Sequence, residues 1–233
     1  MSLDYYNAQE KHWVSPRLVL LYYDDLLKKY GLSAIINERR FDKAIEARTV
    51  AINLLGMQKR DPKNYIMQVP KEINESPDIV TAFRKEYKDR PVQLELQDVE
   101  VVEYTTDETR DLSTFLIEEK LSPLLSRKAY DEKTTILCHI KKPGRFNPNT
   151  IHGDIKKVSP KSLVLLLGKI SEGNYETTQV WPVVGNIQYN VIEEVKKYPK
   201  PDSLKLTLGT NKKIINTQTG LPLPSLEEVF EIK

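Results

Sequence analysis

The runs Pro77-Asp78-Ile79-Val80-Thr81-Ala82-Phe83 and Val92-Gln93-Leu94-Glu95-Leu96-Gln97 decide the fold that we expect. Both are rich in β-branched and apolar residues, and the Lys, Asp and Pro residues between them are typical of a turn between consecutive strands. Together with a shorter apolar run before them, they predict a meander of three strands, at 65–69, 78–83 and 92–104.

Helices and further strands are predicted on both sides of this meander. Apolar residues that recur at spacings of three and four predict a helix at 40–58 and another at 111–125, the latter capped by Asp111 or Thr109. Ser15-Pro16 opens a helix at 17–30 that Gly31 ends, and Ser159-Pro160 opens a buried helix at 161–170. A strand is predicted at 134–140, a loop at 143–158, and weaker strand or turn signals at 177–184, 203–208 and 227–232.

Composition sets limits on the class of protein. The 233 residues suffice for one sizeable core, so we expect a single domain over 1–233. The formal net charge of +2 is typical neither of a strongly basic nucleic-acid binder nor of an acidic disordered chain. One cysteine, Cys138, excludes a disulfide framework, and no apolar run is long enough to span a membrane. Without a signal pattern at the start of the chain, we expect a cytoplasmic protein that does not bind membranes.

Carboxylates recur near the start of the meander. Alternation along the 92–104 strand places Glu95 and Gln97 on one face. If the two longer strands pair, Asp78 and Glu95 can offer two carboxylates to one hard divalent cation. Glu46, on the preceding helix, could complete the ligand shell or orient a water. This pattern predicts a Mg²⁺ site, or a Mn²⁺ site, suited to phosphodiester hydrolysis.

At these residues the sequence resembles the PD-(D/E)XK nuclease superfamily. Pro77-Asp78, Glu95-Leu96-Gln97 and an acidic residue on the preceding helix match its motif over about residues 40–142. The resemblance implies an α/β fold with a restriction-endonuclease-like mixed central sheet flanked by helices, here with an N-terminal helix and a C-terminal extension. The nuclease-like core would cover about residues 40–170.

The resemblance also implies roles for individual residues. Asp78 and Glu95 would bind Mg²⁺ or Mn²⁺, Glu46 would be the helix acid, and Gln97 would stand where the family usually has lysine. The implied activity is hydrolysis of nucleic acid, with DNA as the expected substrate. The resemblance is also compatible with a homodimer, because many members of the superfamily dimerise to cut two strands.

Gln97 is the departure from the family pattern. A glutamine can orient a water or hydrogen-bond an oxygen, but it carries no positive charge and is no base. Lys85, Lys88 or Lys120 could supply the missing ammonium from elsewhere, and the sequence does not choose among them.

Simpler interpretations exist for each of these residues. Asp78 could cap a turn, Glu95 and Gln97 could lie on a solvated strand face, and Glu46 could pair with Lys43 or Arg39 on a solvated helix. The alternative function is therefore a catalytically inactive nuclease-fold protein that binds nucleic acid or another protein. His12, His139 and His152 have no metal-ligand spacing, and no phosphate-binding glycine motif occurs.

A basic segment with one aromatic residue follows the 134–140 strand. Its cations could contact a nucleic-acid backbone, although a solvated loop has the same composition. The candidate nucleic-acid-binding residues are Lys141, Lys142, Arg145, Lys156 and Lys157.

Overall fold

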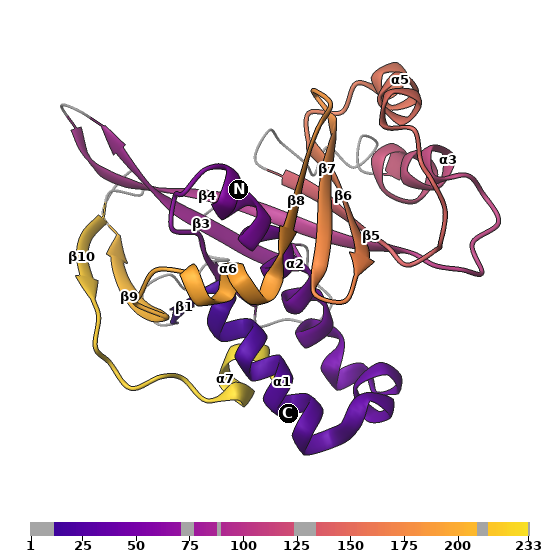
Figure 1. Cartoon of the computed structure of the whole chain (residues 1–233). Coiled ribbons are helices and arrows are strands. Elements are labelled where there is room, and N and C mark those ends of the chain that lie inside the picture. Colours follow the sequence, from indigo (N-terminus) through magenta and orange to yellow (C-terminus); the bar gives the residue numbers. More distant parts are fainter. Residues whose placement is uncertain (1–11, 71–76, 88–89, 124–133, 209–213, 233) are drawn as a thin grey trace. The chain divides into compact units, whose positions relative to one another are not determined.

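A computed structural model describes residues 12–70, 77–87, 90–123, 134–208 and 214–232 of the chain (Figure 1). The fold is α/β with mixed strand pairing. The chain divides into two compact units, one made of residues 1–97 and 193–233 and the other of residues 98–192. Compact units within a chain are not by themselves separate domains, so the single domain remains a prediction.

The first unit has the strand order β10-β9-β1-β2-β3-β4. Its strands are β1 (Trp13–Val14), β2 (Ile66–Gln68), β3 (Ile79–Tyr87), the first part of β4 (Arg90–Tyr104), β9 (Ser203–Leu208) and β10 (Ile214–Gln218). Strands β2, β3 and β4 are neighbours, which confirms the predicted order of the meander. One core cluster contains residues from distant parts of the sequence, namely Trp13, Leu94 and Leu204.

The helices of the first unit are α1 (Pro16–Asn37), the 3-10 turn η2 (Arg39–Phe41), α2 (Asp42–Arg60), α6 (Val191–Lys197, which begins in the second unit) and α7 (Leu226–Phe230). The Ser15 hydroxyl caps α1 by accepting a hydrogen bond from the Leu18 N–H at 3.0 Å. Gly31 interrupts α1 with φ 79° and ψ 156°, a conformation that L side chains rarely adopt. The predicted end of the helix at Gly31 is therefore only partly right: the helical conformation is interrupted there, but the helix resumes and runs to Asn37.

The second unit has the strand order β4-β5-β6-β7-β8. Its elements after β4 are α3 (Leu112–Leu116), the π-helical turn η3 (Ile117–Leu121), β5 (Thr134–Ile140), α5 (Pro148–Val158), β6 (Leu163–Ser171), β7 (Asn174–Trp181) and β8 (Gly185–Asn190). Strands β4, β5 and β6 run parallel, and β7 and β8 are antiparallel to their neighbours. The predicted crossover and mixed pairing are confirmed, as is the Asp111 cap of α3.

The predicted helix at 161–170 is wrong, because this segment is strand β6. Val164, Leu165, Leu166 and Leu167 are all buried. Because successive side chains of a strand point to opposite faces, the burial of all four shows that both faces of β6 are covered. A short apolar run does not distinguish such a strand from a buried helix by its periodicity. Ser159, the predicted cap, ends α5 instead, with a positive φ of 48°.

The predicted loop at 143–158 is wrong over its second half, which is α5. Asn147 caps this helix, Pro148 is its first residue, and only Ile151 and Ile155 are buried. Two apolar residues on one face are too few to mark a helix in the sequence. Strands β8 and β10 and helix α6 also had no counterpart in the prediction, whereas β9 matches its predicted range. No helix in the described ranges combines the length and apolar character needed to cross a membrane.

Candidate functional site

Two of the predicted site residues, Glu46 and Asp78, meet at one lysine. Lys43 and Glu46 lie one turn apart on α2, and Asp78 immediately precedes β3. The Lys43 Nζ lies 3.1 Å from Glu46 Oε2 and 3.5 Å from Asp78 Oδ1, and it donates a hydrogen bond to the Asp78 carbonyl oxygen at 3.4 Å. The Lys43 side chain is only 4% exposed, so the ammonium is enclosed by these groups. We call Lys43, Glu46 and Asp78 the acid–lysine cluster.

The Glu46 carboxyl has a pKa well above its ordinary value. Burial is the largest cause that raises its pKa, followed by the charge of Asp78, whereas the charge of Lys43 lowers it. The balance places the pKa of Glu46 at about 7. Its Oε2 atom is buried and has no aligned hydrogen-bond donor among the described residues. Glu46 can therefore exchange a proton at the pH at which most enzymes work.

Glu95 and Gln97 are placed by strand β4. Leu94 and Leu96 enter the core cluster that also contains Val80 and Ala82 of β3. Alternation therefore directs Glu95 and Gln97 to the opposite face of β4, where both are half-buried. The Thr81 hydroxyl donates to the Gln97 carbonyl oxygen at 3.2 Å, which brings β3 beside β4 at this point.

The acid–lysine cluster supplies two carboxylates, fewer than the three that the sequence predicts. Among the described residues, no group of three or more His, Cys, Asp or Glu side chains is arranged to hold a metal ion. Mg²⁺, however, is commonly held by one or two protein carboxylates, with waters and substrate phosphates completing its shell. Glu46 Oε2 lacks an aligned hydrogen-bond donor, and the charge of Asp78 acts on Glu46, so these two carboxylates fit such a site.

Lys43 is the site residue that sequence reasoning missed. The sequence offers three other lysines for the missing ammonium and favours Lys43 as a partner of Glu46 on a solvated helix. Of those three, Lys120 lies in the second unit with its Nζ 3.6 Å from the buried carboxylate of Glu100. The side chains of Lys85 and Lys88 lie outside the described residues. The spacing of Lys43 to Glu46 and the neighbouring apolar Ala44 were the available signals, but neither indicates burial by itself.

The second unit contains a cleft that the predicted basic segment lines. It has a volume of about 720 Å³. Its charged and aromatic lining residues are His139, Lys141, Lys142, Arg145, Phe146, Lys169 and Glu176. We call it the basic cleft. Three of the five predicted nucleic-acid-binding residues line it, whereas Lys156 and Lys157 lie on the last turn of α5.

The cations of the basic cleft differ in their existing partners. Lys141 forms an ion pair with Glu103 at 2.6 Å, and Lys142 donates to the Glu108 carbonyl oxygen at 2.7 Å. Arg145 is exposed and makes no hydrogen bond or ion pair within the described part of the chain. Arg145 is therefore the cation best placed to bind an added anion such as a phosphate.

Comparisons with known proteins add no relative: neither a protein-family model, nor a curated protein, nor a solved structure matches this chain. The acid–lysine cluster and the basic cleft are therefore the features that bear on the function of this chain.

Proposed function

We propose that this protein is a metal-dependent nuclease with a restriction-endonuclease-like core. One observation carries the proposal: α2 and the start of β3 bring Glu46 and Asp78 to the same buried ammonium. The order α2, β2, β3, β4, α3, β5 also agrees with the order of elements expected for this superfamily. The cluster contains the two acids and the lysine that this chemistry requires, with Lys43 in place of the lysine absent at Gln97.

Each residue of the cluster has a role in this proposal. Glu46 and Asp78 would hold Mg²⁺ or Mn²⁺, which supplies charge neutralisation and an acidic bound water. Lys43 holds the two carboxylates together and places a positive charge beside the phosphate. A bound cation would lower the raised pKa of Glu46 and keep this carboxylate ionised as a ligand. Glu95 stays a proposed further ligand and Gln97 a proposed group that orients water.

A cleavage assay tests this proposal. Purified protein is incubated with duplex DNA, single-stranded DNA and RNA, with Mg²⁺ or Mn²⁺, and in parallel with EDTA. We expect metal-dependent cleavage that Asp78→Asn and Glu46→Gln each reduce by about 100-fold or more. Glu38→Gln is the matched control, because Glu38 is an exposed carboxylate paired with Arg40. Cleavage that survives EDTA or both site variants would contradict the proposal.

A second candidate is a nuclease-fold protein that binds nucleic acid without cutting it. Lys43 favours this alternative, because its ammonium already neutralises the carboxylates that a metal would need. The basic cleft also favours it, because binding requires only exposed cations and room for a ligand. A homodimer and a cytoplasmic location stay predictions under both proposals.

The salt dependence of binding tests the second candidate. Fluorescence anisotropy with labelled DNA and RNA should show affinity that falls steeply with salt. Arg145→Ala should weaken binding about tenfold and make the salt dependence shallower, since one phosphate contact is lost. Lys161→Ala is the control, because Lys161 is an exposed lysine of the same unit that does not line the cleft. Equal effects of the two substitutions would exclude the cleft as the binding surface.

A further inference from the structure

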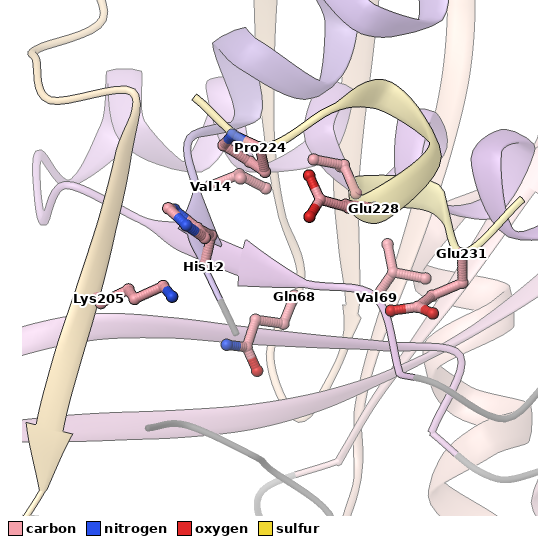
Figure 2. A pocket seen from close by; sticks show the side chains of 9 residues that line it. His12, Val14, Gln68, Val69, Lys205, Pro224, Glu228 and Glu231 are labelled. Carbon is pink, nitrogen blue, oxygen red and sulfur yellow. The ribbon is translucent and has the colours of Figure 1, made fainter. Parts of the chain in front are cut away.

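The first unit contains a small cavity that the proposed function does not use. Its volume is about 260 Å³. Its polar lining residues are His12, Gln68, Lys205, Glu228 and Glu231, and Val14, Val69, Pro224 and Val229 supply the apolar part. They come from β2, from β1 and the residue before it, from β9 and from α7 with its flanks (Figure 2). Drug-sized ligands occupy pockets of about 300–1,000 Å³, so this cavity suits a smaller molecule.

Opposite charges line this cavity at different places. Figure 2 shows Lys205 and His12 on one side, and Glu228 and Glu231 nearer α7. The Lys205 side chain makes no hydrogen bond or ion pair with any residue in the described ranges. It nevertheless lowers the pKa of both His12 and Glu228 through its charge, so its field acts within the cavity. The Lys205 ammonium and the Glu228 carboxylate therefore line the same cavity without forming an ion pair with each other.

The surrounding structure fixes these groups. The Glu228 Oε2 accepts a hydrogen bond from the Ser225 N–H at 2.6 Å, as part of the capping box of α7. The capping box leaves the other oxygen of Glu228 available. His12 Nδ1 lies 2.6 Å from the Ser203 hydroxyl oxygen, and burial lowers the pKa of the imidazole, which is therefore neutral at pH 7. Tyr22 holds α7 in place by donating to the Pro224 carbonyl oxygen at 2.6 Å.

We propose that this cavity binds a small zwitterion of the size of a free α-amino acid, with its carboxylate at Lys205 and its ammonium at Glu228 and Glu231. The two carboxylates would repel a ligand with a single negative charge, and Lys205 would repel a ligand with a single positive charge. A molecule with both charges can form a charge-assisted hydrogen bond on each side of the cavity. The apolar lining, Val14, Val69 and Val229, can contact a short aliphatic side chain.

Titration calorimetry and ligand-observed NMR on the full chain at pH 7 test this proposal. The probes are glycine, L-alanine, L-serine and L-glutamine, with propionate and ethylamine as analogues of alanine that lack one of the two charges. We expect saturable binding of at least one amino acid, and binding at least about tenfold weaker for both analogues. Propionate that binds as well as alanine would show a simple anion site and would overturn the proposal, as would the absence of binding by all four amino acids.

Substitutions locate the binding within this cavity. Lys205→Met and Glu228→Gln should each weaken amino-acid binding about tenfold or more. Glutamine serves in a capping box as glutamate does, so Glu228→Gln removes the charge and keeps the end of α7 intact. Lys196→Met is the control, because Lys196 is an exposed lysine of the same unit outside the cavity. Binding that none of these substitutions changes would place the ligand elsewhere and overturn the proposal.

Discussion

At the scale of single residues, Lys43 determines whether the acid–lysine cluster can exist. Two carboxylates brought together near a protein interior repel each other and lose hydration, and each effect raises the free energy of the folded state. The enclosed ammonium offsets both effects for Glu46 and Asp78. The raised pKa of Glu46 shows that the compensation is incomplete. A functional site commonly retains such an unfavourable arrangement.

Replacing Lys43 by methionine should destabilise the protein. The substitution leaves Glu46 and Asp78 without their shared cation, and we expect the free energy of unfolding at pH 7.5 to fall by about 2–3 kcal/mol. Urea denaturation measures this change. The double variant Lys43→Met/Glu46→Gln should recover about 1 kcal/mol, because the two residues interact directly. Lys28→Met, which breaks an exposed ion pair with Asp25, should have no measurable effect.

Glu46 should also make stability depend on pH. In the folded chain Glu46 keeps its proton up to about pH 7, whereas its ordinary pKa is 4.5. The stabilisation from the bound proton is fully present below pH 4.5 and is lost as the pH rises to about 7. We expect the stability of the wild type relative to Glu46→Gln to fall by on the order of 2 kcal/mol over this range. Parallel stability curves for the two proteins would contradict the raised pKa.

At the scale of secondary-structure elements, capping residues and glycine in the sequence predicted where elements begin and end better than hydrophobic periodicity predicted whether they are helices or strands. The kink of α1 at Gly31 follows directly from glycine, since the conformation there is strained for any L side chain. Strand β6 has no comparable local determinant. Its leucine-rich run is a strand because β5 and β7 supply hydrogen-bonding partners on both sides.

Two glycine substitutions should have opposite effects on stability. Gly31→Ala puts a side chain at φ 79°, where open space surrounds the added carbon, so the cost comes from the backbone alone. We expect a loss of about 1–3 kcal/mol. Gly153→Ala, in the exposed middle of α5 and also in open space, should stabilise by about 0.5–1 kcal/mol. Thermal unfolding measures both variants, and a loss of stability in both would contradict the backbone argument.

At the scale of the whole molecule, the path of the chain makes the first unit depend on its last residues. The chain leaves this unit after residue 97 and returns to it at residue 193. Strand β9 pairs with β1, and Leu204 and Leu206 of β9 share a core cluster with Trp13, Ile66 and Leu94. The C-terminal segment is therefore part of the core of the first unit.

Removal of residues 193–233 should unfold the first unit. The truncation deletes the partner of β1 and exposes the core cluster that Leu204 and Leu206 complete, so amide protons of β1 and β2 should lose their protection against hydrogen exchange. Hydrogen exchange followed by mass spectrometry measures this. A full-length Phe230→Ala variant, which opens a cavity at a fully buried side chain, should lose about 3–5 kcal/mol but keep the pairing of β9 with β1. Unchanged protection of β2 in the truncated chain would contradict this dependence.

The sequence by itself determined the features whose causes lie within a few residues. The caps at Ser15 and Asp111 and the break at Gly31 depend on local hydrogen bonds and backbone strain. These physical causes act within a short segment whatever the rest of the chain does.

Only the tertiary structure decided the features that depend on distant segments. Lys43 is buried because Asp78, from beyond α2 and β2, approaches it, and Leu163–Ser171 is a strand because two other strands pair with it. The amino-acid-sized cavity combines His12 with Lys205 and Glu228 from the far end of the sequence. The burial of a side chain and the pairing of a strand depend on distant residues that folding brings close. The periodicity of the segment itself does not specify these neighbours.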